Sequence, residues 1–146
     1  MSTIIIPAYN EELLILDTVN NLLEQVSDED EIIVVTNGCT DKTYEVLNEF
    51  QNRIKLIDTD IPSKTNAINI GELHANSFPR IYFDADIHLT SGSLDKIKQE
   101  LNSGELFAVS PEPKMDVSNS SWAVRAYYDI WLSLPYCQNG MIGSGV

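Results

Sequence analysis

The sequence predicts an α/β protein with a mostly parallel sheet and helices on both faces. Short apolar runs alternate at least four times with segments whose apolar residues recur at helical spacing. Such alternation is typical of parallel strands joined by right-handed helical crossovers. A chain of 146 residues can bury a sizeable core, so we treat residues 1–146 as a single domain.

The first strand is expected over residues 3–6, an uninterrupted apolar run that ends at Pro7. Such runs are typical of strands buried on both faces of a parallel sheet. A helix should follow, with Asn10 as its N-cap and two glutamates in its first turn. Its apolar residues share one face: Ile15, Val19, Leu22, Leu23 and Val26.

The second strand is expected over residues 32–35 and ends at the turn Thr36-Asn37-Gly38. A helix should follow over about residues 40–50, with Asp41 in its first turn, where a carboxylate complements the helix dipole. A third strand is expected over residues 54–57.

The third helix is expected to begin after Ser63, which is a favourable N-cap. Lys64 stands in its first turn, and Asn69 and Gly71 follow. We expect Gly71 to permit close packing of this helix, because glycine has no side chain to hold its neighbours apart.

The fourth strand is expected over residues 81–83. Beyond it we expect a helix that opens at residue 91 or 92, a fifth strand over residues 106–109 and a last helix over about 119–134. The aromatic residues of the last helix fit either a buried core or a surface that stacks on sugars.

Two carboxylates, Asp84 and Asp86, follow the fourth strand directly. At the carboxyl end of a strand, both can point into the crevice where open α/β sheets bind ligands. Neighbouring carboxylates repel, so a positive group should lie beside them, and a divalent cation that holds a phosphate is one answer. The alternative is that Asp84 and Asp86 are two solvated aspartates in a turn. A second pair, Asp58 and Asp60, follows the third strand and is a weaker candidate for the metal site.

Composition narrows the classes of partner. The net charge of -13 argues against a nucleic-acid partner, because no basic stripe is present to replace counterions. No apolar run approaches the roughly 20 residues that a membrane helix needs, so any membrane association should be peripheral at most. Two distant cysteines and no signal-like start favour a reducing, cytoplasmic location, with the inner membrane face as the place of any peripheral contact.

Four stretches, taken in order, resemble the family 2 glycosyltransferases of GT-A fold, a Rossmann-like nucleotide-diphospho-sugar transferase fold. These are residues 4–12, residues 34–41, Lys64 with Asn69 and Gly71, and residues 82–86. Each motif is weak alone, but each falls at the carboxyl end of an expected strand or in the helix after it. The resemblance extends from residue 3 to about residue 87, and residues 143–146 look like the segment before the family's acceptor-binding half.

The resemblance implies a donor, an acceptor and a cofactor. The donor would be a UDP- or GDP-sugar, and the acceptor a hydroxyl of a glycan, a lipid or another molecule. Mn²⁺ or Mg²⁺ would be held by Asp86 and Asp84, which offer the oxygen ligands that suit either ion. The transfer would invert the anomeric configuration.

The resemblance also implies the residues that contact the nucleotide sugar: Pro7, Ala8, Tyr9, Glu11, Asn37, Lys64, Asn69, Asp84 and Ala85. Asn37 stands where the family more often has an aspartate that reads the base, so the base stays open. Lys64 would neutralise a diphosphate oxygen, with an ordinary exposed lysine as the alternative. For Glu11 the alternative is complementation of the helix dipole.

No catalytic residue is assigned. Inverting transfer needs a general base, which the resemblance places in the half that follows the glycine turn, beyond Val146. We therefore expect the chain to be incomplete at its C-terminus, and to bind donor without transferring sugar.

Three other classes of protein are alternatives to a glycosyltransferase. A sugar-phosphate nucleotidyltransferase should show a glycine-rich loop with an arginine after the first strand, and residues 7–10 have neither. A receiver-like domain would place acidic residues where Pro7 stands. A module that binds a nucleotide sugar without turnover stays open.

Overall fold

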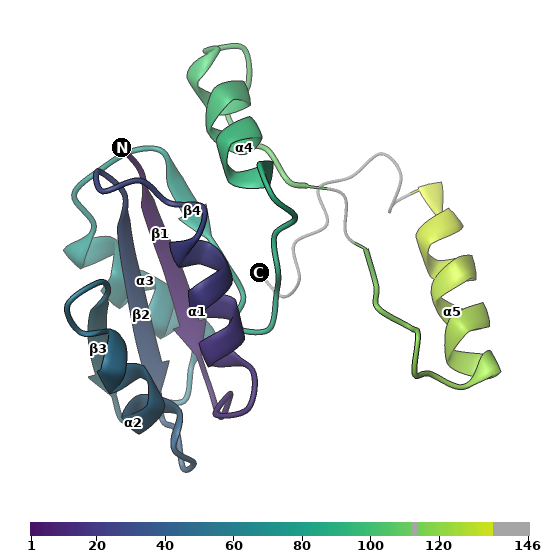
Figure 1. Cartoon of the computed structure of the whole chain (residues 1–146), viewed down its shortest axis with the longest axis horizontal. Coiled ribbons are helices and arrows are strands. Elements are labelled where there is room, and N and C mark those ends of the chain that lie inside the picture. The colour runs from purple at the N-terminus through teal and green to yellow at the C-terminus, as the bar shows by residue number, and fades with distance from the viewer. Residues whose placement is uncertain (112–113, 136–146) are drawn as a thin grey trace.

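The computed structural model describes residues 1–111 and 114–135, and a four-stranded parallel sheet forms their centre (Figure 1). Its strands are β1 (Thr3–Ala8), β2 (Glu31–Asn37), β3 (Lys55–Thr59) and β4 (Arg80–Tyr82). Each neighbouring pair is parallel. The α/β class predicted from the alternation of apolar runs is confirmed.

The strand order is β3-β2-β1-β4, so β1 lies between β2 and β4. Thr3 pairs with Glu31 on one side and with Arg80 on the other. The chain first winds outward from β1 to β3 and then crosses to the other side of β1. The switch point between β1 and β4 is the place where such sheets bind ligands.

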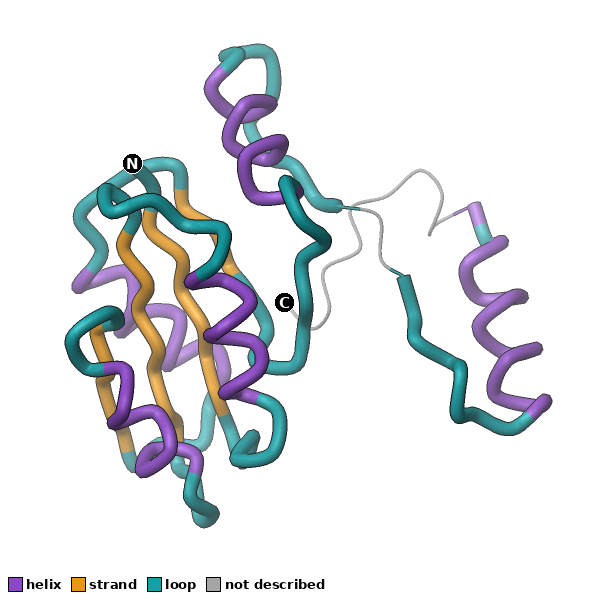
Figure 2. Tube along the Cα trace, in the orientation of Figure 1, coloured by secondary structure: helices purple, strands orange, loops and turns teal. Residues whose placement is uncertain are grey.

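Helices cover both faces of the sheet (Figure 2). On one face lie α1 (Ile15–Leu23) and α2 (Thr43–Leu47), which continues into a 3-10 turn (Asn48–Phe50). On the other face lies α3 (Lys64–His74). The helix α4 (Ser93–Asn102) adds its buried Leu94 to the core on the α1 side.

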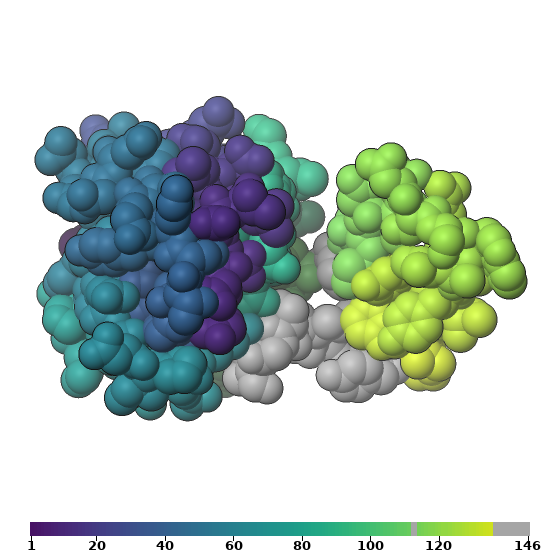
Figure 3. Space-filling model, turned by 90° about the horizontal axis from the view of Figure 1, so that it is seen from below, coloured from purple at the N-terminus to yellow at the C-terminus, as the bar shows by residue number. Residues whose placement is uncertain are grey.

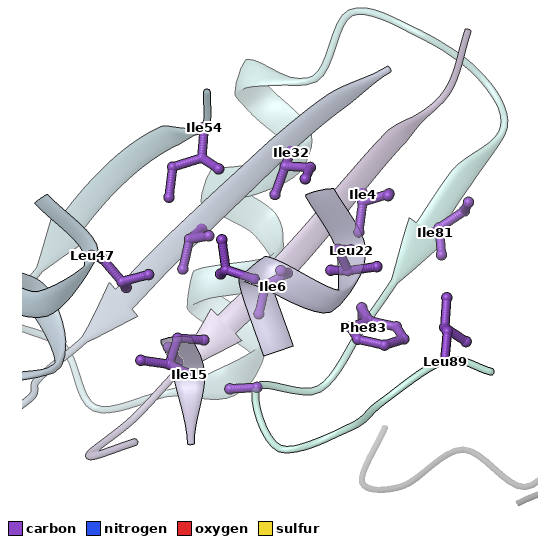
Figure 4. Packing of buried hydrophobic residues seen from close by; sticks show 14 of the residues in the cluster. Ile4, Ile6, Ile15, Leu22, Ile32, Leu47, Ile54, Ile81, Phe83 and Leu89 are labelled. Atoms are coloured by element: carbon purple, nitrogen blue, oxygen red, sulfur yellow. The ribbon is translucent and has the colours of Figure 1, made fainter. Parts of the chain in front are cut away.

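The larger hydrophobic core lies between α1 and the sheet (Figure 4). Ile4 and Ile6 of β1 point into it beside Ile15 and Leu22 of α1, and all four are fully buried. The intervening Ile5 points to the opposite face, towards α3. There a Cβ atom added to Gly71 would lie 2.4 Å from Cγ2 of Ile5, which confirms that this glycine permits close packing.

The first helix begins later than predicted. The structure starts α1 at Ile15, so the prediction of Asn10 as its N-cap is wrong. Asn10 instead adopts a left-handed backbone with φ of 54°, a conformation that asparagine tolerates better than most residues. Its Oδ1 accepts a hydrogen bond from the backbone N–H of Thr40, so it links two loops. The predicted cap Ser63, by contrast, is confirmed, because its hydroxyl accepts from the N–H of Asn66.

The predicted fifth strand over residues 106–109 is wrong. The structure assigns no strand there, and Phe107 is fully exposed. A strand needs a hydrogen-bonded neighbour, and none of the described strands pairs with this segment.

The helix α5 (Trp122–Ser133) contributes no buried residue. Figures 1 and 3 show it standing apart from the sheet. Its rings contact one another instead, with the Tyr128 ring centroid 5.3 Å from that of Tyr127 and 6.4 Å from that of Trp131. The prediction that these aromatic residues form a buried core is therefore wrong for the described part of the chain. Residues 143–146 and Cys137 lie outside the described residues.

Candidate functional site

A cavity of about 490 Å³ lies where β1, β2 and β4 reach their carboxyl ends. The residues that line it come from the ends of β1 and β2, from the loops after β1, β3 and β4, and from the start of α3: Pro7, Tyr9, Glu11, Asn37, Pro62, Lys64, Asp84, Ala85 and Asp86. The fold thus brings together most of the residues that the sequence predicted as contacts of a nucleotide sugar, together with both predicted metal ligands.

Two predicted contacts lie elsewhere. Ala8 is fully buried at the end of β1, and Asn69 lies on the exposed face of α3. Neither lines the cavity. The second acidic pair is also outside the lining, and Asp58 accepts a hydrogen bond from the hydroxyl of Thr36.

Lys64 supplies a positive group beside the paired carboxylates. Its Nζ lies 2.6 Å from Oδ1 of Asp84, and both side chains are partly exposed. The pair forms because Ser63 caps α3, which places Lys64 in the first turn of that helix. The backbone N–H groups of a helix N-terminus and a lysine together favour an anionic ligand at this end of the cavity.

The cavity carries an excess of negative charge. Three carboxylates line it, from Glu11, Asp84 and Asp86, against the one ammonium of Lys64 among the described lining residues. Burial raises the pKa of the Glu11 carboxyl above its ordinary value, and the negative charges of Asp86, Asp41 and Asp84 raise it further. A raised carboxyl pKa marks a place where an added cation is favourable.

Among the described residues, no group of three or more His, Cys, Asp or Glu side chains is arranged to hold a metal ion. The oxygen atoms of Asp84 and Asp86 still fit Mg²⁺ or Mn²⁺ when a bound phosphate supplies further ligands. Mg²⁺ is commonly held by one or two carboxylates together with substrate phosphates and water. Asp84 and Asp86 can supply the protein's share of such oxygen ligands, so the residues present fit a cation that binds with a diphosphate.

Asn37 is held in a fixed orientation at the base of the cavity. Its side chain is buried, and its Nδ2 donates to the carbonyl oxygen of Ala8 at 2.8 Å. This bond uses one amide N–H and fixes the amide plane. The side chain can therefore offer Oδ1 to a ligand as a hydrogen-bond acceptor.

A set of hydrogen bonds joins the loop after β1 to the loop after β2. The backbone N–H of Glu12 donates to Oδ2 of Asp41 at 3.1 Å, and the N–H of Lys42 donates to Oε2 of Glu12 at 2.9 Å. The N–H of Glu11 donates to the Thr43 hydroxyl at 2.8 Å, which in turn donates to Oδ1 of Asp41. We name these five residues, Glu11, Glu12, Asp41, Thr43 and, through its backbone, Lys42, the loop clamp.

The clamp explains why the pKa of the Asp41 carboxyl is lowered. Burial acts to raise the pKa of this carboxyl, but hydrogen bonds from Thr43 and from the backbone of Glu12 outweigh it and hold the pKa below its usual value. The helix α2 begins at Thr43, so Asp41 lies just before the helix rather than in its first turn. Its role is to tie two loops together.

The sequence interpretation missed Pro62 and the clamp residue Thr43 as parts of the site. Pro62 lines the cavity and packs against Gly38, where an added Cβ atom would lie 2.8 Å from Cβ of Pro62. Gly38 also has φ of +63°, which L side chains rarely adopt. The Asn-Gly pair after a strand is the signal in the sequence, but only the fold shows that Pro62 is its neighbour.

A family model described as Glycosyl transferase family 2 matches residues 3–141, which is most of the chain. The chain belongs to glycosyl transferase family 2. Membership confirms the resemblance that the four sequence motifs indicated.

Curated relatives of this family 2 chain include a probable glycosyltransferase and a glycan synthase. A probable glycosyltransferase, YdaM of Bacillus subtilis (strain 168), is 33% identical over 93 residues, which cover 58% of this chain and 22% of YdaM. A poly-beta-1,6-N-acetyl-D-glucosamine synthase of Staphylococcus epidermidis is 32% identical over 85 residues, which cover 56% of this chain and 21% of the synthase. The chain thus spans about a fifth of the length of these relatives.

Solved structures show the same fold. The crystal structure of S. aureus TarS 1-349 in complex with UDP-GlcNAc matches with a TM-score of 0.62 and 23% identity. The match covers 70% of this chain and 32% of the TarS chain. This likeness confirms the predicted GT-A fold. In the described part of the family 2 chain, none of the helices combines the length and apolar character needed to cross a membrane.

Proposed function

We propose that this family 2 chain binds a nucleoside-diphosphate sugar in the cavity and forms the donor site of a glycosyltransferase. The observation that carries the proposal is the convergence of Asp84, Asp86 and Lys64 at the switch point between β1 and β4. Two negative groups and one positive group at this position suit a diphosphate bound together with a divalent cation. The names of the relatives, which are glycosyltransferases or a glycan synthase, support the same reaction class.

The diphosphate is expected at the start of α3. There Lys64 offers its ammonium group, and the first turn of the helix offers backbone N–H groups. Asp86, with Asp84, would hold Mn²⁺ or Mg²⁺ against the same diphosphate. When bound, such a cation would act as a Lewis acid that stabilises negative charge on the departing nucleoside diphosphate.

The base is expected at Asn37. Because one amide N–H is used by the carbonyl of Ala8, the side chain offers its Oδ1 as an acceptor. An acceptor at this point suits a ring N–H, which uracil and guanine both carry, and TarS, which has a similar fold, was solved in complex with UDP-GlcNAc. We therefore propose a UDP-sugar as the donor, ahead of a GDP-sugar.

The transfer itself is proposed to be a single displacement with inversion. The acceptor hydroxyl forms a bond to the anomeric carbon, and the bond from that carbon to the diphosphate oxygen breaks. The hydroxyl proton passes to a general base, which typically contributes about 10²–10⁴ in rate. None of the described residues is assigned as this base. The acceptor is proposed to be a hydroxyl of a glycan, a lipid or another molecule.

Calorimetric titration of the chain with UDP, GDP and UMP in Mn²⁺ buffer tests the proposed donor. We expect UDP to bind more tightly than GDP, because TarS, which has a similar fold, was solved with UDP-GlcNAc and with UDP. We expect UMP to bind weakly, because it lacks the second phosphate that Lys64 and the cation would contact. Equal binding of UMP and UDP would contradict the diphosphate site, and a preference for GDP would contradict the assignment of uracil.

A further inference from the structure

Three polar side chains along α1 and just after it face the segment that carries the paired carboxylates. These are Thr18, Asn21 and Gln25, whose spacing of three and four residues places them on one face of a helix. Each of them binds the backbone of the segment after β4 rather than another side chain. We call these three residues the polar stripe of α1.

The contacts of the stripe are short, and the first is buried. The Thr18 hydroxyl donates to the carbonyl oxygen of Ala85 at 2.8 Å, and both residues are buried. Asn21 makes a double contact with Leu89, accepting from its N–H at 2.8 Å and donating to its carbonyl at 3.1 Å. Gln25 donates to the same carbonyl at 3.2 Å.

These contacts matter because the sheet stops short of the carboxylates. The strand β4 ends at Tyr82, and just beyond its end the N–H of Phe83 donates to the carbonyl of Ile5 in β1. Ala85 lies beyond that bond, between the two aspartates, with its methyl group buried in the α1 core. A buried carbonyl needs a partner, and α1 supplies it through the Thr18 hydroxyl.

The anchor at Ala85 sets the direction of both carboxylates. Ala85 stands in a turn directly between the two aspartates. Phe83 and Ala85 belong to the buried core, and Asp84 and Asp86, on either side of Ala85, line the cavity together with it. Fixing the backbone at Ala85 therefore fixes the two carboxylates on either side of it.

We propose that Thr18 is a positioning residue, which sets the geometry of Asp84 and Asp86 for a cation and a diphosphate without touching either. Asn21 holds the far end of the same segment at Leu89. The inference rests on the proposed function, because it concerns the use of these carboxylates in donor binding. Thr18 is buried in α1 and lies outside the cavity lining, so its own side chain does not meet the ligand.

Thr18→Val tests the inference, since it keeps the shape of the side chain and removes the hydroxyl. The carbonyl of Ala85 then loses its partner and the segment shifts. We expect the affinity for UDP in Mn²⁺ to fall roughly tenfold, the effect of leaving one buried acceptor unpaired. We expect the much weaker affinity in EDTA to stay unchanged. The electron paramagnetic resonance spectrum of bound Mn²⁺ should also change, because the carboxylates around it move.

Two further variants separate positioning from mere stability. Thr18→Ser keeps the hydroxyl and should restore both the affinity and the spectrum. Thr3→Val is the matched control, because Thr3 is also buried and its hydroxyl donates to the carbonyl of Ser77 at 3.0 Å, at the opposite end of the sheet. It should lower the melting temperature without changing the affinity for UDP in Mn²⁺.

If Thr18→Val folds too poorly to titrate, Asn21→Ala provides the second variant, with the same expected loss of metal-dependent affinity. The inference is overturned if Thr18→Val, or Asn21→Ala in its place, binds UDP in Mn²⁺ as tightly as the unmodified chain does. If the unmodified chain itself gains no affinity from Mn²⁺, the proposed function fails first, and the inference fails with it. The two failures are thus told apart by the unmodified chain.

Discussion

The ammonium of Lys64 lies 2.6 Å from a carboxylate oxygen of Asp84, a residue 20 positions later in the chain. The two residues meet because the start of α3, which follows β3, and the loop after β4 both lie at the carboxyl end of the parallel sheet. In the proposed function each group also binds a ligand, because Lys64 contacts the diphosphate and Asp84 contacts the cation. The ion pair therefore joins the two parts of the donor site.

Lys64→Met is expected to have opposite effects on two ligands. Without the lysine, Asp84 loses a competing cation, so Mn²⁺ alone should bind about threefold more tightly, as expected for a partly exposed ion pair. UDP in Mn²⁺ should bind more weakly, because the diphosphate loses its ammonium partner. Calorimetry with each ligand measures both effects. Lys42→Met is the control for net charge, since Lys42 lies outside the cavity lining, and a similar result for both variants would contradict the account.

Asp86→Asn is expected to weaken UDP binding in Mn²⁺ by at least tenfold, because it removes a charged ligand that cation binding requires. Asp58→Asn should change the same affinity little, since Asp58 lies within β3 and outside the cavity lining. Titration of both variants under identical conditions measures the difference. The reverse ranking would mean that the other acidic pair holds the cation.

Thr43→Val tests the loop clamp. The variant removes the hydroxyl that accepts from the N–H of Glu11 and donates to Asp41. Because the clamp holds the loop that carries Tyr9 and Glu11 against the loop that follows Asn37, the affinity for UDP should fall roughly tenfold both in Mn²⁺ and in EDTA. Thr43→Ser keeps the hydroxyl and should bind like the unmodified chain. A loss confined to Mn²⁺ buffer would show that the clamp acts on the cation instead.

Asp30 should make the stability of the fold depend on acid. Burial acts to raise the pKa of this carboxyl, but hydrogen bonds from Lys98, Ser27 and Ser2 outweigh it and hold the pKa well below its usual range. A depressed pKa stabilises the fold above the unfolded value, about 3.9 for aspartate, and this contribution is lost as the pH falls towards the folded value. Asp30→Asn should therefore cost about 2–3 kcal/mol at pH 7.

The measurement for Asp30 is urea unfolding of the unmodified chain and of Asp30→Asn across a range of pH. The difference between their free energies of unfolding should be constant near neutral pH and should shrink below about pH 4. A difference that grows as the pH falls would contradict the assigned direction of the pKa. Asp28→Asn in the same loop is the matched control, because Asp28 is exposed.

The sequence predicted what depends on local patterns. Uninterrupted apolar runs such as residues 3–6 placed the parallel strands, because strands buried on both faces need apolar side chains throughout. The alternation of strands with helices predicted the sheet, and a strand-end Asp84 with Asp86 predicted the crevice. The cap at Ser63 and the packing of Gly71 also followed from short-range chemistry.

What the sequence did not predict depends on contacts between distant segments. The left-handed backbone of Asn10 is set by the loop that it binds at Thr40, so its capping propensity was misleading. Residues 106–109 have the composition of a strand but no described strand beside them. In the sequence Thr18 is indistinguishable from any other helical residue, and only the fold shows that its hydroxyl binds the carbonyl of Ala85.

The most direct measurement is calorimetric titration of the chain with UDP, in Mn²⁺ and again in EDTA. We expect clear binding in Mn²⁺ and a large loss of affinity in EDTA, because Asp84 and Asp86 need a cation to bind a diphosphate. Equal affinity in the two buffers would contradict a metal-dependent donor site at the switch point between β1 and β4.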